Sequence, residues 1–276
     1  MNKKILTILA VLLLFLTIST ASAGFLDFFG SSTSNVTNDE KTLVIGFNPE
    51  FPPFGYKTDN GTYTGFDLEL AKEVCNRNNW TFSPQPIINW ESKEMELNSG
   101  EIDCIWSGFT INNRENDYTW SDPYFNNTQV FVVKENSNIS SISDLKGKTV
   151  EVQGESSGLY ALEHDNKTIS DTFSNIQKVN DFNTAFMDLK SGACDAVLVD
   201  VPCADYQLTG KFNSTDFKIL DEPLTLEQYG VGFKKGNNEL RNQVQKTLDE
   251  MYKDGTVDKI AQNYSSYGIP ENIIHK

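Results

Sequence analysis

One segment of the sequence occurs twice, 92 residues apart. Residues 95–104 and 187–196 share the pattern Met-acid-Leu-polar-Ser-Gly-x-x-Asp. Each copy predicts the end of a helix, a glycine stop, a turn led by aspartate and a buried strand. Because the same local structure is expected in both places, the chain is predicted to contain two lobes of similar α/β build.

Strand and helix patterns alternate along the rest of the chain. Buried strands are predicted at residues 42–47, 149–152, 195–199 and 229–233, and helices at 65–74 and from about 238 to 254. In the first of these helices, Phe66, Leu70 and Val74 recur at helical spacing. This alternation is typical of parallel sheets covered by helices.

The N-terminus has the three parts of a secretory signal peptide. Two lysines precede an apolar run over residues 5–18, and small residues follow it up to residue 23. The apolar run is short for a membrane span of about 20 residues, although an uncleaved N-terminal anchor remains the alternative. Residues 24–40 are rich in Gly, Ser, Thr and Asn and predict a flexible tether. Either alternative places the folded part outside the cytoplasm, in the periplasm or associated with the cell surface.

The charge balance excludes one class of function. The chain carries 23 Lys and Arg against 38 Asp and Glu, for a net charge of -15. Proteins that bind nucleic acids need a basic face for the phosphates. We therefore expect no nucleic-acid partner.

The four cysteines leave two alternatives open. Cys75 lies near the end of the first helix and Cys104 begins a strand, so both are expected at the same edge of a sheet. A Cys75–Cys104 disulfide and a pair of free thiols are equally compatible with this placement. Cys194 and Cys203 flank one strand and are too far apart to pair. No cysteine pair has metal-ligand spacing, and we expect neither a metal nor a cofactor.

The repeat also aligns the far ends of the two strands that it predicts. When the alignment of the two copies is extended toward the C-terminus, Gly108 aligns with Asp200. Ligands of open α/β sheets bind beyond the carboxyl ends of the strands. If these two edges face each other, Arg114 in one lobe and Asp200 in the other would give a cleft with one cation and one anion. Such a cleft is complementary to a zwitterion.

An α-amino acid is the simplest ligand of this kind. Arg114 can bind a carboxylate through two parallel N–H···O bonds, which a lysine cannot match. Asp200 can accept from the ammonium group, together with the Thr110 hydroxyl and the carbonyl of Gly108. The backbone N–H groups and hydroxyls near Ser156 and Ser157, between a strand and a helix, could form a second carboxylate cradle.

Aromatic residues could complete the pocket. Phe51 and Phe54 lie in a proline-rich loop after the first strand, and Trp90 follows the second. Each of them could stack on a ligand side chain, but ordinary core packing is the commoner role of any single one of them. Arg114 likewise has an alternative role as a solvated loop arginine beside Glu115.

A series of short motifs extends from Lys41 to Tyr267. They are, in order, FPPF (51–54), GFDLELAKEV (65–74), SGEID (99–103), the GFTI loop with its arginine (108–114), WSDPY (120–124), DLKGKTVEVQ (144–153), SGACDAVLVD (191–200), QYGVGF (228–233) and LDEMYKDGT with KIA (248–261). Each motif alone is modest, but their order and spacing are specific. Through them the chain resembles a known family, the extracytoplasmic amino-acid-binding proteins of ABC importers.

The resemblance implies a periplasmic-binding-protein-like type II fold, with two α/β lobes joined by two hinge strands. Lobe 1 would comprise residues 41–129 and 232–276, and lobe 2 residues 130–231. The family's ligand-binding positions map onto Phe51, Trp90, Gly108, Thr110, Arg114, Gln153, Ser156, Ser157 and Asp200. The implied partners are a free amino acid and the transmembrane subunits of an ABC permease, and we expect a monomer.

Three positions depart from the family pattern. The loop from Thr110 to Arg114 is one residue shorter than usual. Glu155 occupies a position that is usually glycine, and Asn48 replaces a frequent aspartate. These changes touch the pocket rim, so the preference for a ligand side chain cannot be copied from the family.

Capture of a polar or charged amino acid for import is therefore the predicted function. A dehydratase-like enzyme on the same fold is one alternative, but His164 and His275 lie outside the cleft motifs and no acid/base or nucleophile pair is evident. A ligand sensor is the other alternative, which would be expected to carry a signalling extension after Lys276. We expect a binding protein without catalytic residues.

Overall fold

The computed structural model describes residues 41–212 and 215–275. The predicted signal peptide and tether lie outside these residues. The strands are β1 Thr42–Phe47, β2 Glu50–Phe51, β3 Gly55–Lys57, β4 Tyr63–Thr64, β5 Thr81–Pro86, β6 Cys104–Ile105, β7 Thr119–Trp120, β8 Phe125–Lys134, β9 Thr149–Gln153, β10 Asn175–Val179, β11 Ala196–Asp200, β12 Phe217–Ile219, β13 Thr225–Tyr229 and β14 Gly232–Phe233. The α-helices are α2 Phe66–Asn78, α3 Lys93–Ser99, α4 Ser157–Tyr160, α5 Lys167–Ser170, α6 Phe182–Ser191, α7 Val201–Tyr206, α8 Asn238–Lys253 and α9 Thr256–Gln262.

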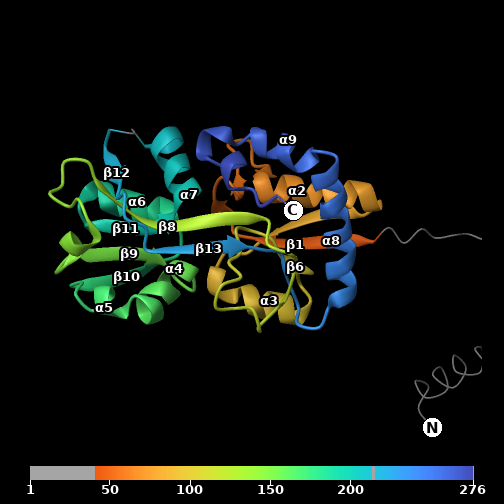
Figure 1. Cartoon of the computed structure of the whole chain (residues 1–276), viewed down its shortest axis with the longest axis horizontal. Helices are drawn as coiled ribbons and strands as arrows, with labels where there is room; N and C mark the ends of the chain where they lie inside the picture. The colour runs from red at the N-terminus through yellow and green to blue at the C-terminus, as the bar shows by residue number, and fades with distance from the viewer. Residues whose placement is uncertain (1–40, 213–214, 276) are drawn as a thin grey trace, which may run out of the picture. The chain divides into compact units, whose positions relative to one another are not determined.

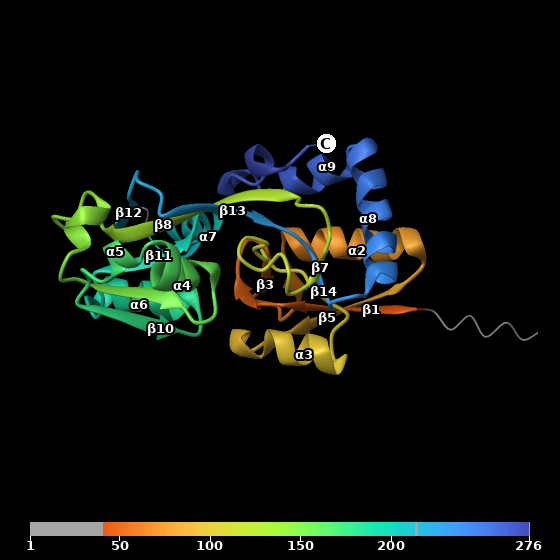
Figure 2. The same ribbon diagram turned by 60° about the horizontal axis from the view of Figure 1, so that its bottom comes forward.

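Lobe 1 is built on a five-stranded sheet with the order β5-β1-β6-β14-β7. Strand β1 runs parallel to β5 and β6, whereas β14 runs antiparallel to β6 and β7. Figure 2 shows helices α2, α8 and α9 on one side of this sheet and α3 on the other. The sheet is thus covered on both faces, as the alternating pattern predicts.

Lobe 2 is built on a second sheet with the order β10-β9-β11-β8-β12, and β13 also pairs with β8. Alternate residues of β11 pack in two different hydrophobic clusters, one on each face of the sheet. Val197 and Val199 pack with the residues of α6 and α7, whereas Ala196 and Leu198 pack with α4. Both faces of β11 are therefore buried, and the apolar run over residues 196–199 follows from that.

The two repeated segments have the same structure in the two lobes. Helix α3 ends at the left-handed Gly100, with φ 84°, and α6 ends at the left-handed Gly192, with φ 89°. A side-chain oxygen of Asp103 accepts a hydrogen bond from the N–H of Val44, at 2.8 Å. Asp195 accepts the corresponding bond from Thr149, at 2.9 Å. The predicted repeat of helix, glycine stop, aspartate and strand is confirmed.

Strands β8 and β13 join the lobes. They pair antiparallel, with Phe125 opposite Tyr229 and Gln129 opposite Thr225. Figure 1 shows the two strands running side by side from the sheet of lobe 2 toward lobe 1. The predicted lobe boundaries, after residues 129 and 231, fall within β8 and just beyond β13, and they stay predictions.

The strand predicted at residues 229–233 is wrong in one respect, because it consists of two strands in different sheets. Strand β13 ends at Tyr229 in lobe 2, and β14 begins at Gly232 in lobe 1. Between them the chain passes close to aromatic and aliphatic side chains of the 109–120 region. A Cβ atom on Gly230 would lie 2.8 Å from Ile111, and one on Gly232 would lie 2.8 Å from Phe109. Glycine is needed where the chain changes sheets.

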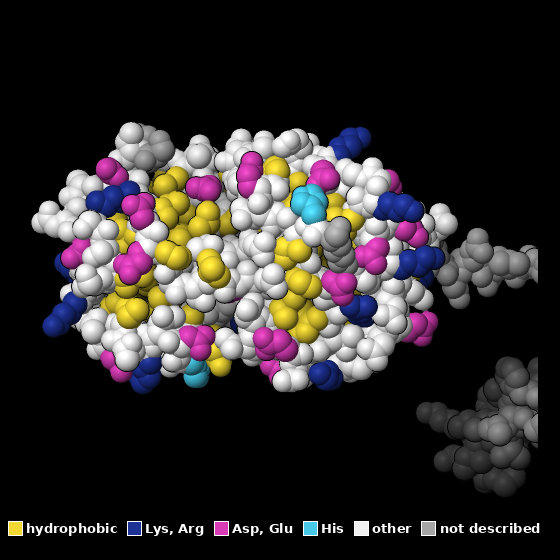
Figure 3. Space-filling model, in the orientation of Figure 1, with side chains coloured by type: hydrophobic (Ala, Val, Ile, Leu, Met, Phe, Trp, Pro, Cys, Tyr) yellow, Lys and Arg dark blue, Asp and Glu magenta, His cyan; other side chains and the backbone are white. Residues whose placement is uncertain are grey.

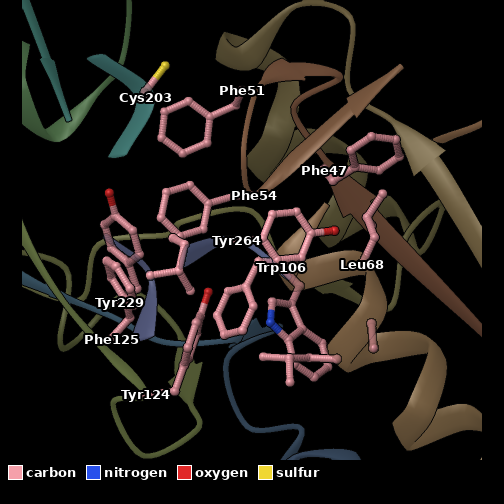
Figure 4. Packing of buried hydrophobic residues seen from close by; sticks show 14 of the residues in the cluster. Phe47, Phe51, Phe54, Leu68, Trp106, Tyr124, Phe125, Cys203, Tyr229 and Tyr264 are labelled. Atoms are coloured by element: carbon pink, nitrogen blue, oxygen red, sulfur yellow. The ribbon is translucent and has the colours of Figure 1, made fainter. Parts of the chain in front are cut away.

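One hydrophobic cluster includes buried residues from both lobes. Figure 4 shows its aromatic part, in which Phe51 of lobe 1 and Cys203 of lobe 2 approach each other. The ring of Phe51 also lies 5.9 Å from that of Phe182 at the start of α6. The lobes therefore share apolar contacts next to the edges that carry the predicted site.

The Cys75–Cys104 disulfide, one of the two alternatives for this pair, is not formed in the structure. Both cysteines are buried free thiols in the same hydrophobic cluster, as are Cys194 and Cys203. Burial is the main cause that raises the pKa of Cys104 well above its usual range, and the neighbouring Cys75 adds a smaller effect. Of the two alternatives for this pair, the structure has the free thiols.

Basic and acidic side chains are interspersed on the face shown in Figure 3. Lysine and arginine form no continuous basic patch among the described residues on that face, which agrees with the net charge. No helix within residues 41–212 and 215–275 has the length and apolar character that crossing a membrane requires.

Candidate functional site

The predicted site residues follow the carboxyl ends of parallel strands. In lobe 1, β1 ends at Phe47 and the parallel β6 ends at Ile105. In lobe 2, the parallel strands β9 and β11 end at Gln153 and Asp200. The loops after β1, β6 and β9 and the last residue of β11 contribute to one cavity between the lobes. The strand-end rule therefore accounts for the location of the cavity.

All nine predicted ligand-binding residues line this cavity. They are Phe51, Trp90, Gly108, Thr110, Arg114, Gln153, Ser156, Ser157 and Asp200, and Asn48, Ser107 and Phe109 complete the lining. The volume of the cavity is about 30 Å³. The two lobes thus lie close together around it.

Arg114 is the cation of this cavity. Its Nη2 atom donates to the carbonyl of Glu155 in lobe 2, at 3.2 Å, and its guanidinium lies 5.2 Å from the ring centre of Phe109. No carboxylate in the described part of the chain lies within salt-bridge distance of it. Burial lowers the pKa of Arg114, but a guanidinium stays charged. Its charge is therefore available to an anion.

The loop before Arg114 closes as a tight turn. The N–H of Arg114 donates to the carbonyl of Ile111, at 2.9 Å, and Asn113 takes up a left-handed backbone with φ 65°. The indole N–H of Trp120 donates to the carbonyl of Arg114, at 3.0 Å. These contacts fix the backbone of the arginine.

Asp200 is the anion that lines the cavity, at the end of β11. It accepts hydrogen bonds from the side-chain amides of Asn127, at 2.5 Å, and Gln129, at 2.8 Å, and also from the hydroxyl of Tyr229. Burial, followed by the nearby carboxylate of Glu227, raises the pKa of Asp200 above its usual range. Its environment is rich in neutral donors, and no lysine, arginine or histidine within residues 41–212 and 215–275 forms a salt bridge with it.

Gly108 allows a close approach between two parts of lobe 1. Its φ is 53°, and a Cβ atom would lie 2.5 Å from Phe51. Its N–H donates to a carboxylate oxygen of the buried Asp67, at 2.6 Å. The hydroxyl of Tyr124 donates to the other oxygen of Asp67, at 2.8 Å. Asp67, near the start of α2, therefore positions the backbone of the Gly108 loop.

The lobe 2 loop after β9 is held by its own polar groups. The hydroxyl of Ser156 donates to the carbonyl of Gln153, at 2.7 Å, and accepts from the N–H of Leu159, at 3.1 Å, as the N-cap of α4. The side chain of Gln153 donates to the carbonyl of Asn180, at 2.8 Å. The hydroxyl of Ser157 has only a long contact of 3.4 Å with Gln129. Of the two serines of this loop, Ser157 thus has the hydroxyl that is more available to a ligand.

Two aromatic residues enclose the cavity from the lobe 1 side. The ring of Phe51 stacks on that of Phe54, with centroids 5.4 Å apart. Trp90, in a short 3₁₀ turn at residues 90–92, packs edge-on against Phe109, with centroids 5.9 Å apart. Both side chains line the cavity and also belong to hydrophobic clusters. The two roles considered for them from the sequence are compatible.

Residues 43–267 match the family described as bacterial extracellular solute-binding proteins, family 3. The chain belongs to this family.

Relatives of this solute-binding protein bind amino acids. The present chain is 30% identical to the L-cystine-binding protein TcyJ of Escherichia coli K12, over 83% of this chain and 85% of the relative. A substrate-binding protein of an ABC uptake transporter from Streptococcus pneumoniae, solved with bound histidine, has a TM-score of 0.77 and 32% identity, and 81% of this chain and 92% of that one are covered. An ancestral arginine-binding protein bound to arginine has a TM-score of 0.75 and 37% identity, with coverages of 82% and 98%.

These findings confirm the predicted fold and function. The chain has the periplasmic-binding-protein-like type II fold and is an extracytoplasmic solute-binding protein, and its relatives include amino-acid-binding proteins. The family is one of solute-binding proteins and not of enzymes.

Sequence reasoning missed several residues around the cavity of this solute-binding protein. Asn127 and Gln129 of β8 donate hydrogen bonds to Asp200. Glu227 of β13 lies near Asp200, whose pKa is raised by burial and then by Glu227. The alternation of Phe125, Asn127 and Gln129 along one strand face could have indicated that two amides accompany a buried aromatic ring. Glu227 gives no such signal, since its strand is short and mixed.

Lys93 is a further missed residue, at the first position of α3. Its side chain is only 4% exposed, and its Nζ atom lies 5.4 Å from the ring centre of Trp90. It has two long contacts of 3.4 Å, with the carbonyls of Trp90 and Glu155. Burial, and then the charge of Arg114, lowers the pKa of Lys93 to about 8. Its spacing of four from the buried Leu97 is the sequence signal for its burial.

Within the described ranges, no group of three or more His, Cys, Asp or Glu side chains is placed to hold a metal ion. His164 lies outside the cavity lining, where its ring stacks on that of Tyr160 with centroids 4.2 Å apart.

Proposed function

We propose that this protein binds one free amino acid in the cavity between its lobes, with Arg114 on the carboxylate and Asp200 on the ammonium group. The observation that carries the proposal is the placement of these two opposite charges, from different lobes, in the lining of one cavity. Neither has a counter-ion of its own among the described residues. A zwitterion would supply both missing charges, which offsets the cost of burying them.

The remaining lining residues have supporting roles in this proposal. Thr110, the Gly108 backbone and Ser157 would add hydrogen bonds to the charged ends of the ligand, while Gln153 and Ser156 hold their loop in place. Phe51 and Trp90 would contact the ligand side chain. Because the cavity of about 30 Å³ is too small for an amino acid, the lobes must separate for it to enter and close on it afterwards.

The relatives suggest which ligands to test, without fixing one. Their ligands include L-cystine, histidine and arginine. We propose that the protein carries its ligand, unchanged, as a monomer to the transmembrane subunits of an ABC permease. Residues 1–23 would direct export, either as a cleaved signal peptide or as a retained anchor.

A thermal-shift screen of the protein against the proteinogenic L-amino acids and L-cystine tests this function. A ligand that binds the folded protein raises the midpoint of unfolding by mass action. We expect a shift with at least one compound, its loss in Arg114→Ala and in Asp200→Ala, and recovery of the compound unaltered after incubation. Wild-type affinity in either variant would contradict the proposed roles of these residues.

A further inference from the structure

Asp200 has a second carboxylate beside it, that of Glu227 on β13. The two side chains are buried, with exposed fractions of 6% and 4%. The amide of Asn127 donates to Asp200 at 2.5 Å and to Glu227 at 2.6 Å. The amide of Gln129 donates to the same two acids, at 2.8 and 2.9 Å. Two buried acids therefore share the same two donor groups.

The orientation of the Asn127 amide shows that its donor end is committed to the acids. Its Nδ2 atom contacts both carboxylates, whereas its Oδ1 atom is buried and has no hydrogen-bond partner within the described residues. An unpaired buried acceptor is costly. The arrangement is consistent with a negative charge on the pair that holds the NH₂ group in this orientation.

The charged and titratable groups around the pair come from three elements. The hydroxyl of Tyr229 on β13 donates a hydrogen bond to Asp200. Burial, and then the charge of Asp200, raises the pKa of Cys203 on α7. Arg114 faces Glu227 from the loop in lobe 1 and interacts with it through space. No lysine, arginine or histidine in the described ranges forms a salt bridge with either acid.

Two buried carboxylates in contact cannot both ionise without a large cost. A proton shared between them removes that cost, because one acid then donates to the other. The raised pKa of Asp200, caused first by burial and then by Glu227, agrees with this geometry. An ammonium group removes the same cost, because it brings a full positive charge and several N–H donors.

We propose that the Asp200–Glu227 pair holds one proton in the ligand-free protein and releases it to solvent when the ammonium group of an amino acid binds. The O–H bond of the protonated acid breaks, the proton passes to water, and the N–H groups of the ligand form hydrogen bonds to the carboxylate oxygens in its place. This inference rests on the function proposed above. It makes Glu227 a positioning residue that sets the protonation of Asp200.

Proton release makes the affinity depend on pH in a defined direction. A ligand that binds only the deprotonated pair binds more tightly as the pH rises, by roughly tenfold per pH unit while the free pair is protonated. The dependence ends above the pH at which the free pair loses its proton. Between pH 6 and 7 the α-carboxylate and α-ammonium groups of a free amino acid keep their charges, so they do not contribute. The imidazole of histidine titrates in this interval, so if histidine binds most tightly the next-tightest titrant is measured instead.

Isothermal titration calorimetry on the full-length protein tests the proposal. The titrants are the proteinogenic L-amino acids and L-cystine, and the tightest of them is measured at pH 6 and pH 7. At each pH two buffers of different ionisation enthalpy, such as phosphate and imidazole, are compared. We expect the Kd to fall several-fold to tenfold over this interval, and the difference in enthalpy between the buffers to correspond to nearly one released proton.

The Glu227→Gln variant keeps an acceptor oxygen for the two amides and removes the second acid. We expect its Kd to be nearly constant from pH 6 to pH 7, with no buffer-dependent enthalpy. Glu135→Gln is the matched control, because it makes the same change of charge at an exposed position of lobe 2. It should release the proton as the wild type does.

Each result decides between the two levels of the proposal. Binding with the same Kd at both pH values and no buffer dependence in the wild type overturns the proton release and leaves the proposed function intact. Proton release that persists in Glu227→Gln overturns the assignment to this pair. If none of the titrants binds, the proposed function fails and this inference fails with it.

Discussion

Lys93 and Arg114 donate to the same acceptor, the carbonyl oxygen of Glu155, at 3.4 and 3.2 Å. Both cations belong to lobe 1 and the acceptor to lobe 2. Glu155 has a left-handed backbone with φ 53°, although it is not a glycine. A residue in the left-handed region thus presents its carbonyl to two positive charges. The contact links the lobes beside the cavity.

We predict that Lys93→Met stabilises the protein at neutral pH. The pKa of Lys93 is about 8 in the folded protein and about 10.5 in the unfolded chain. Between these two pH values the folded state binds fewer protons than the unfolded state, so the stability of the protein rises with pH there. The destabilising effect of Lys93 is therefore full at pH 7 and decreases as the pH rises from about 8 to about 10.5. Urea unfolding at pH 7 should show a gain of about 1–3 kcal/mol, which shrinks by pH 10. The exposed Lys235→Met should show no gain, and an equal gain at both pH values would contradict the explanation.

Arg114→Lys should weaken amino-acid binding by roughly 10- to 100-fold. An ammonium keeps the charge but loses the two parallel hydrogen bonds of a guanidinium, which is worth about 1.5–3 kcal/mol. The fold should persist, because backbone contacts hold the loop. Arg77→Lys, on the outer surface of lobe 1, is the control and should leave the Kd unchanged in calorimetry. Equal affinities of the Arg114→Lys variant and the wild type would rule out bidentate recognition.

Gly108→Ala should impair both binding and stability. The added Cβ would lie 2.5 Å from Phe51, in the aromatic wall of the cavity, and the backbone has a positive φ. Gly100→Ala is a matched control, since Gly100 also has a positive φ, of 84°, but has open space around it. We expect both variants to lose about 1–2 kcal/mol of stability from the backbone. Only Gly108→Ala should also raise the Kd, by at least about tenfold.

Glu151→Gln should stabilise the protein above pH 7 and have little effect at pH 4.5. Glu151 is buried on β9, and one of its oxygens has no partner among the described residues. Burial, and then Asp188, raises its pKa to about 7, so the folded state loses stability as the pH rises from about 4.5 to 7. Thermal unfolding at pH 8 should show a gain of about 1–2 kcal/mol. A gain of the same size at pH 4.5 would point to packing and not to ionisation.

The sequence was sufficient to predict the fold because the repeated segment carries its own structural reasons. Gly100 and Gly192 end equivalent helices, and Asp103 and Asp195 accept hydrogen bonds from β1 and β9, respectively. The strand-end rule then placed Gly108 and Asp200 at the same cavity. These are local rules, and a single sequence is enough to apply them.

The residues that were missed depend on contacts between distant segments. Glu227 meets Asp200 because β13 pairs with β8 and β8 with β11, a register that no local pattern encodes. The split of residues 229–233 into two strands has the same cause, since apolar alternation does not show which sheet a strand joins. The 3.4 Å contact of Lys93 with the carbonyl of Glu155 in the opposite lobe is also set by tertiary structure.

The strands that join the lobes also carry the shell around Asp200. Asn127 and Gln129 belong to β8, and Glu227 and Tyr229 belong to β13. Any rotation of one lobe against the other must twist these strands, and it will therefore move the donors and the second acid that surround the anion. The same strands therefore connect the lobes and set the electrostatic environment of the ligand. A mutation in them that changes the angle between the lobes will also change the groups around Asp200, and with them the affinity for the ligand.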